Sequence, residues 1–280
     1  MFTGIYGHQK QIALLTKSMQ SGKIAHAFLF TGPSFVGKHE VAKIFARTLL
    51  EHSRNDFHPD LLELSEEPIK IEQIRDLAYK LALRPYQAKY KVAIIDNADS
   101  MTIEAQNALL KILEEPKIYT ILILVTSNPG KLLRTISSRT QKINFGLVPP
   151  EEYQKLLSEN PEDEQTLLTL SAGRPGLARR ITADPELVEK IKGIESSFNI
   201  IQTQDISEKL KLAYDLADLE TADLKQVLDF WLMGYEQLLN QKPTLANAKN
   251  IVQINLSRKF LDQNVNSKLL LTNLMLNLQT

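Results

Sequence analysis

Apolar residues occur along the first half of the chain in two patterns, as short continuous runs and as helical stripes. The run Ile121–Val125 is typical of a strand that is buried on both faces of a sheet. Between such runs, apolar residues recur at spacings of three and four, which predicts amphipathic helices. The expected strands are Ala27–Phe30, Asp60–Leu64, Val92–Ile95, Ile121–Val125 and Lys142–Phe145.

Helical stripes separate these strands. The expected helices are 5–20, Glu40–Leu50, Ile71–Leu81 and Thr102–Glu115. Pro116 closes the last of them, because proline cannot continue a helix. Strands that alternate with helices of this length predict an α/β fold built on a parallel sheet covered on both faces.

The pattern changes at Val148–Pro150, after which strand signals stop. Glu151–Glu159, Glu164–Ala172 and a segment from Arg174 onward are expected to form short helices, and the chain from Pro185 onward is helical in pattern. We therefore expect three domains, which are an α/β domain at 1–147, a small helical lid at 148–184 and an all-α domain at 185–280.

A phosphate-binding loop follows the first strand. It is bounded by Gly32 and Gly37, and Lys38 stands at the start of the next helix. The backbone N–H groups of such a loop cradle phosphates, the helix N-terminus favours negative charge, and the lysine reaches the terminal phosphates. The sequence therefore predicts a site for ATP or ADP with Mg²⁺, in which Lys38 contacts phosphate.

Two residues depart from the pattern of a working ATPase. His39 stands where a Ser or Thr hydroxyl would ligate the metal. Asp96 ends the strand Val92–Ile95 and supplies the expected carboxylate for Mg²⁺, but Asn97 replaces the glutamate that would polarise water. These departures predict a degenerate site without intrinsic turnover. An active ATPase that tolerates both substitutions is the alternative.

Composition excludes several other classes of function. The 280 residues contain no cysteine, which rules out disulfides, thiolate zinc sites and thiol nucleophiles. No signal-peptide pattern and no long apolar run are present, so we expect a cytoplasmic protein without membrane contact. The net charge is zero, although residues 1–148 contain 19 Lys and Arg against 14 Asp and Glu. A stand-alone DNA-binding module is compatible with this weak basic excess, but no dense basic cluster supports it.

Taken in order, these segments resemble the AAA+ clamp-loader family, and within it the delta-prime branch of bacterial DNA polymerase III subunits. The resemblance spans nearly the whole chain. It rests most specifically on Gln106–Pro116 and Ile136–Gln141, and the phosphate loop alone is much less specific. Further matching stretches are Gly22–Pro33, His58–Asp60 and Asn264–Leu271.

The resemblance implies roles for individual residues. Arg139 matches the arginine that such subunits present in trans to ATP on the neighbouring subunit. Asn128 matches the polar residue that closes the strand Ile121–Val125 near the γ-phosphate, and Arg174 matches the lid arginine that senses nucleotide in cis. The implied partners are the motor and delta-type subunits of a clamp loader, the sliding clamp and primed DNA, and the helical domain 185–280 would be the collar through which subunits associate.

The family pattern is also incomplete here. Its members usually carry a four-cysteine zinc module before the segment His58–Asp60, whereas Glu51–Phe57 bridges this gap without cysteine. No zinc is therefore expected. Two other functions stay open, which are an active motor subunit of the same family and, less consistent with the sequence, the DNA-binding module.

Overall fold

The computed structural model describes residues 2, 4–52, 57–156, 168, 171, 173–183, 185–203, 205–261, 263 and 265–279. The chain divides into two compact units. The first unit comprises Met1–Glu159 with Gly173–Leu177, and the second comprises Asn160–Ala172 with Ala178–Thr280. The expected helix Glu164–Ala172 lies outside the described residues except at 168 and 171, and the division into three domains stays a prediction.

The first unit is built on a five-stranded parallel sheet, which confirms the predicted α/β class. The strands lie in the order β2-β3-β4-β1-β5, and every pair is parallel. All residues of β1, β3 and β4 are buried, as the continuous apolar runs predict for central strands. The strands are β1 (Ala27–Thr31), β2 (Leu61–Leu64), β3 (Lys91–Ile95), β4 (Thr120–Thr126) and β5 (Gln141–Asn144).

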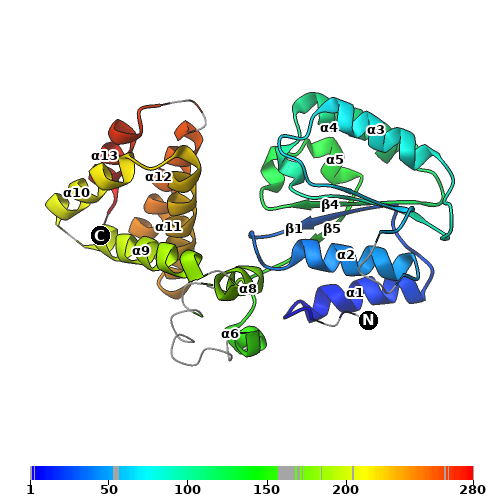
Figure 1. Ribbon diagram of the computed structural model, residues 1–280, viewed down its shortest axis with the longest axis horizontal. Helices are drawn as coiled ribbons and strands as arrows, with labels where there is room; N and C mark the ends of the chain where they lie inside the picture. Colours follow the sequence, from blue (N-terminus) through cyan, green and yellow to red (C-terminus); the bar gives the residue numbers. More distant parts are fainter. Residues whose placement is uncertain are drawn as a thin grey trace. The chain divides into compact units, whose positions relative to one another are not determined.

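Helices cover both faces of this sheet (Figure 1). Helices α1 (Gln9–Gln20) and α2 (Lys38–Leu49) lie on one face, where Phe28, Phe30 and Phe45 belong to one buried cluster. Helices α3 (Ile71–Ala82), α4 (Ile103–Glu114) and α5 (Arg134–Ser138) share a second cluster with Ala27 and Leu29 of β1. The residues of one strand thus alternate between two cores, because successive strand side chains point to opposite faces.

The predicted start of the first helix is wrong. The first helix begins at Gln9 rather than near residue 5, because the chain turns sharply at Gly7 and His8. Both residues have positive φ, 71° and 61°, which ends any regular helix there. Few residues other than glycine adopt positive φ, and the spacing of apolar residues carries no information about φ. The apolar pattern therefore could not predict the turn at His8.

The second unit is helical, as its periodicity predicts. Its buried cluster includes the fully buried Trp231, whose indole N–H donates to Ser197 Oγ over 2.9 Å. Asn250 of α12 is fully buried, and its side-chain amide bonds the N–H and the C=O of Gln279, which ties the segment after α13 to α12. The helices are α9 (Pro185–Gln202), α10 (Ile206–Ala217), α11 (Thr221–Gln241), α12 (Leu245–Leu261) and α13 (Ser267–Asn277).

Short helices follow the sheet along the chain. These are α6 (Pro150–Tyr153), a 3-10 turn η3 (Gln154–Leu156) and α8 (Pro175–Ala183), while η1 (Ala98–Ser100) and η2 (Pro129–Lys131) lie between strands and helices of the first unit. Among the residues that the structure describes, none of the helices combines the length and the hydropathy needed to cross a bilayer.

Candidate nucleotide-binding site

The predicted phosphate loop connects β1 to α2 at the carboxyl edge of the sheet. Gly32 and Gly37 both have positive φ, 142° and 103°. At Gly32 a Cβ atom would lie 2.0 Å from the carbonyl oxygen of Phe145, so only glycine fits there. The strand order changes direction beside β1, which lies between β4 and β5, and ligands of open α/β sheets bind at such a point.

Lys38 is held at the centre of this loop. Its side chain is 6% exposed, and its Nζ donates to the carbonyl oxygens of Gly32 (2.7 Å) and Pro33 (2.6 Å). An ammonium group has three N–H donors, so these two bonds orient the group and leave one donor for a phosphate oxygen. Burial is the main cause that lowers the pKa of Lys38 to about 8. The carboxylates of Asp96 and Asp99 raise this pKa, and the Arg174 guanidinium lowers it further.

This lowered pKa predicts a pH-dependent contribution of Lys38 to stability. The folded chain releases the Lys38 proton near pH 8, whereas the unfolded chain retains it up to about 10.5, so between these values the unfolded state binds more protons. The free energy of unfolding of the wild type is therefore expected to rise, relative to Lys38→Met, by about 2 kcal/mol from about pH 7.5 to about pH 9.5.

Urea unfolding of both proteins at the two pH values measures this difference. Methionine keeps the length of the side chain but cannot titrate, so other groups cancel in the comparison. A stability difference that stays constant between the two pH values would mean that the Lys38 ammonium is not destabilised by burial.

The structure places Asp96 beside the loop, where its carboxylate lies against the His39 side chain. The His39 Nδ1 atom lies 3.2 Å from Asp96 Oδ2, an ion-pair distance without the angle of a hydrogen bond. Asn97, in a left-handed conformation with φ 47°, donates its backbone N–H to Asp96 Oδ1 over 3.0 Å. The Asn97 side-chain amide is turned to Glu67, to whose Oε1 atom it donates over 2.5 Å.

These residues do not fit a bound Mg²⁺ ion. Magnesium prefers octahedral oxygen ligands and usually retains several waters, and in this loop class a hydroxyl after the lysine is one of those ligands. At that position the chain offers an imidazole nitrogen instead, and this nitrogen lies beside the Asp96 carboxylate. Within the described part of the chain, no cluster of three or more His, Asp or Glu side chains is placed to hold a metal.

The end of β4 contributes a third group of polar residues. The Thr126 hydroxyl donates to Asp99 Oδ1 over 2.5 Å and accepts the backbone N–H of Asn128 over 3.0 Å. The Asn128 side chain itself is exposed. Asp99 lies close enough to Lys38 to raise the pKa of that lysine. It is not among the site residues that the sequence predicts, although its position shortly after β3, near Asp96, could have indicated it.

The segment that begins at Gly173 packs on the phosphate loop within the first unit. Arg174 is 3% exposed and lies close enough to Lys38 to lower its pKa, so these two predicted residues are brought together. The backbone N–H of Gly176 donates to the carbonyl of Phe35 over 2.8 Å. A Cβ atom at Gly176 would lie 2.7 Å from that carbonyl oxygen, so this close approach also requires glycine.

His8 also contacts the loop, and sequence reasoning missed it. Its Nε2 atom lies 2.8 Å from the carbonyl oxygen of Val36, and its ring packs edge-on against Phe145. Burial lowers the pKa of His8 despite the bond to the carbonyl. The neutral tautomer that carries hydrogen on Nε2 donates this bond, and no pattern in the sequence around residue 8 indicates it.

Arg139 is placed in a different part of the first unit, at the C-terminal end of α5. Its Nη2 atom pairs with Glu114 Oε1 over 2.9 Å, and its Nη1 donates to the carbonyl of Thr135 over 3.2 Å. The Arg139 and Glu114 side chains are 38% and 51% exposed, so this ion pair contributes no more than about 1 kcal/mol. The Arg139 guanidinium is therefore accessible and weakly held.

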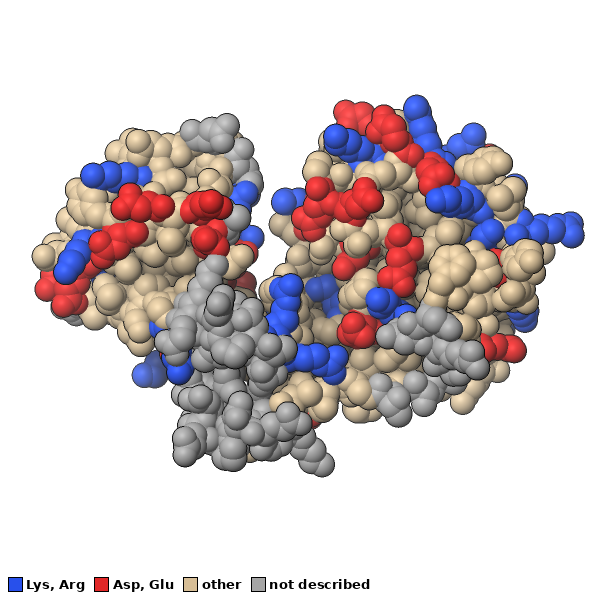
Figure 2. Space-filling model, in the orientation of Figure 1, with Lys and Arg blue, Asp and Glu red and all other residues tan. Residues whose placement is uncertain are grey.

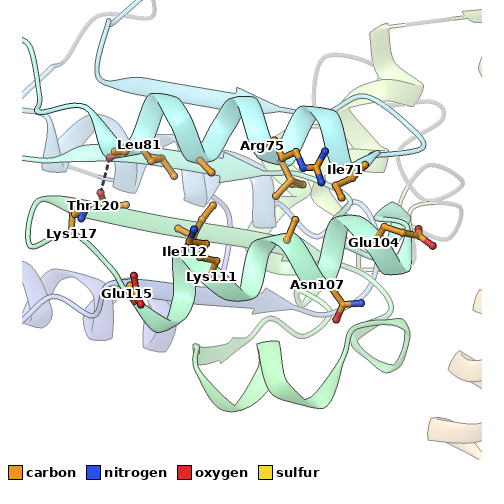
Figure 3. Close-up of a pocket in the computed structure, with 14 residues that line it drawn as sticks. Ile71, Arg75, Leu81, Glu104, Asn107, Lys111, Ile112, Glu115, Lys117 and Thr120 are labelled. Atoms are coloured by element: carbon orange, nitrogen blue, oxygen red, sulfur yellow. Dashed lines mark hydrogen bonds between the residues drawn. The ribbon is translucent and has the colours of Figure 1, made fainter.

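A separate groove of about 870 Å³ runs between α3 and α4 (Figure 3). Its apolar lining includes Ile71 and Ile112, and Arg75, Glu104 and Lys111 lie along it. Thr120 closes one end, where its hydroxyl donates to the carbonyl of Leu81 over 3.4 Å. None of the predicted site residues lines this groove, so it is not part of the nucleotide site.

The parallel sheet, its strand order and the glycine-bounded loop with Lys38 define the first unit as a P-loop domain of the AAA+ class. A family model described as "DNA polymerase III, delta subunit" matches residues 7–148, just over half of the chain. The chain belongs to this family of AAA+ clamp-loader proteins.

Individual relatives agree with this assignment. The chain is 34% identical over 182 residues to the DNA polymerase III subunit gamma/tau of Mycobacterium tuberculosis, which covers 58% of this chain and 32% of that protein. It is 25% identical over 299 residues to the DNA polymerase III subunit delta' of Pseudomonas aeruginosa, which covers 85% of this chain and 91% of that protein. The chain thus spans about a third of the length of the gamma/tau relatives.

A solved structure shares the fold. A DNA polymerase III gamma subunit-related protein from Thermotoga maritima matches with a TM-score of 0.54 at 20% sequence identity, over 94% of this chain and 97% of that one. This likeness supports the fold alone, which is an α/β unit joined to helical segments.

Proposed function

We propose that the chain is a delta-prime-like clamp-loader subunit of the DNA polymerase III holoenzyme that does not hydrolyse ATP itself. It acts beside ATP-binding motor subunits, presents Arg139 to the nucleotide of a neighbour, and takes part in loading the sliding clamp onto primed DNA. Its partners are the motor and delta-type subunits, the clamp and, within the complex, the DNA.

The observation that carries this proposal is the arrangement around Asp96. A hydrolytic site of this class needs a metal-ligating hydroxyl after the lysine and a carboxylate that polarises water. Here the His39 imidazole contacts the Asp96 carboxylate, and the Asn97 side-chain amide donates a hydrogen bond to Glu67. The frame that binds phosphate is complete, while both groups that would drive hydrolysis are replaced.

Arg139 supplies the second part of the proposal. A guanidinium offered in trans must reach beyond its own chain, and the Arg139 side chain is exposed at the end of a short helix in an ion pair that costs little to break. The alignment with the delta' relative also extends over 85% of this chain, which includes much of the helical second unit.

The alternative is an active motor subunit of the gamma/tau type. It is favoured by the identity of 34% to the gamma/tau relatives over 182 residues, which exceeds the 25% identity to the delta' relative. In this case His39 and Asn97 would be tolerated substitutions. The two functions differ in whether the isolated chain turns over ATP.

ATP turnover by the purified full chain, with Mg²⁺ present, separates these functions. We expect the rate of the wild type to equal that of Lys38→Ala, because neither protein has the groups that activate water. Steady turnover by the wild type that Lys38→Ala abolishes would contradict the proposal and establish the motor function.

A stand-alone DNA-binding module is the least supported function. On the face shown in Figure 2, acidic and basic side chains are mixed over the region of α3 and α4. Strong non-specific DNA binding requires a concentrated basic surface that neutralises many phosphates. This face of the described chain does not offer one.

A further inference from the structure

A side chain of the protein lies where a metal ion would otherwise contact the Asp96 carboxylate. His39 is the second residue of α2, and its Nδ1 atom lies 3.2 Å from Asp96 Oδ2. Both side chains are partly buried, with exposures of 30% and 23%, so the pair is only partly screened by solvent. The Asp96 carboxylate, which would otherwise attract a metal ion, already has an imidazole and the Asn97 N–H beside it.

The other residues of the site do not restore a place for Mg²⁺. Asn97 directs its amide to Glu67, and the Thr126 hydroxyl donates its proton to Asp99. Magnesium is a hard cation that prefers oxygen ligands in a nearly ideal octahedron, and an imidazole nitrogen is a poor substitute. Neutralisation of a phosphate must therefore come from the protein.

The protein offers two buried cations for this purpose. Lys38 is 6% exposed and Arg174 is 3% exposed, and the two lie close enough to affect each other electrostatically. The carbonyls of Gly32 and Pro33 fix the Lys38 ammonium inside the loop, with a third N–H donor remaining. A phosphate oxygen can accept this remaining donor beside the N-terminus of α2, which also favours negative charge.

We propose that the loop binds a nucleotide polyphosphate without Mg²⁺, and that His39 excludes the metal through its contact with Asp96. The proposal deepens the proposed function, on which it rests, because nucleotide held without metal stabilises the subunit but is not hydrolysed. His39 is then the residue that determines the metal dependence of the site.

Calorimetric titration of the full chain with ATP, in excess Mg²⁺ and in EDTA, tests the proposal. For the wild type we expect the two dissociation constants to agree within about twofold. His39→Ser supplies the missing hydroxyl and releases Asp96, so its affinity is expected to rise at least about tenfold when Mg²⁺ replaces EDTA, which is about 1.4 kcal/mol. The matched control His26→Ser changes an exposed histidine just before β1 and is expected to behave as the wild type.

Three results would overturn the proposal. The first is wild-type binding that is tenfold tighter with Mg²⁺, and the second is no detectable binding of ATP in EDTA. The third is binding that depends on Zn²⁺ or Ni²⁺ and is lost in His39→Ser, which would make His39 a ligand of a softer metal. The wild-type titrations decide the first two even if His39→Ser fails to fold.

Failure of this proposal is distinguishable from failure of the proposed function. If ATP binding requires Mg²⁺ while Arg139→Ala still lowers ATP turnover of the assembled loader, only the metal-free site is wrong. If binding is independent of Mg²⁺ while Arg139→Ala leaves that turnover unchanged, the subunit binds nucleotide but does not complete its neighbour's site.

Discussion

Replacement of Arg139 with alanine is expected to lower ATP turnover at the neighbouring subunit's site in the assembled loader by about 10³-fold or more. A guanidinium that reaches the transferred phosphoryl group from another subunit stabilises the charge that develops in the transition state. Arg139 is suited to this role because its side chain is 38% exposed and, among the residues that the structure describes, is held by Glu114 and by the carbonyl of Thr135.

The matched control is Arg134→Ala. Arg134 is an exposed arginine on the same short helix, so its loss changes the surface charge equally but removes no proposed contact with nucleotide. Steady-state ATP turnover is measured with clamp and primed DNA present, and gel filtration confirms that each variant enters the complex. Equal rates for Arg139→Ala, Arg134→Ala and the wild type would show that Arg139 does not act in trans.

Replacement of Asp60 with alanine is expected to lower the free energy of unfolding of the first unit by about 3–5 kcal/mol. The Asp60 carboxylate is fully buried and accepts the backbone N–H groups of Tyr86 (2.7 Å), Gln87 (2.8 Å) and Ala88 (3.0 Å). Its Oδ1 atom also lies 4.0 Å from the Nζ of Lys91, a side chain that is only 9% exposed. Alanine would leave these donors and a buried cation without their partner.

The Asp60 contribution has a defined pH dependence. Burial raises the pKa of Asp60, but the three N–H bonds and Lys91 outweigh it and hold the pKa below its ordinary value. A lowered carboxyl pKa stabilises the folded state above the pKa of the unfolded chain, and this stabilisation is lost as the pH falls through the folded value. The difference between wild type and Asp60→Ala should therefore be full at neutral pH and shrink in acid.

Chemical denaturation at neutral and acidic pH measures both effects. Glu63→Ala is the control, because Glu63 forms only a partly exposed pair with Lys43 at 3.5 Å, and it is expected to change stability by less than about 1 kcal/mol. A loss below 1 kcal/mol for Asp60→Ala as well would mean that water replaces the carboxylate at these N–H groups.

The periodicity of the sequence predicts the fold of this chain well, and the reason is physical. Strands buried on both faces must be continuously apolar, and helices that cover a sheet must carry an apolar stripe, so β4 and α4 are readable directly. The loop around Lys38 is equally readable, because glycine is required where the backbone is left-handed or closely approached.

The side-chain contacts that determine the chemistry of the site cannot be predicted from the sequence pattern. The sequence shows that His39 and Asn97 depart from the ATPase pattern. It does not show that His39 contacts Asp96 or that Asn97 donates a hydrogen bond to Glu67. These contacts join segments far apart in the chain, and only the folded sheet brings them together. The burial of Arg174 beside Lys38 and the contact of His8 with the loop have the same origin.

The central claim is that this subunit acts on its neighbour's nucleotide and not on its own. The most direct test compares Arg139→Ala and Lys38→Ala of this chain in otherwise identical assembled loaders, with ATP turnover measured in the presence of clamp and primed DNA. We predict that Arg139→Ala lowers the rate strongly and that Lys38→Ala leaves it unchanged. A rate that falls with Lys38→Ala and not with Arg139→Ala would contradict the claim and identify the chain as a motor.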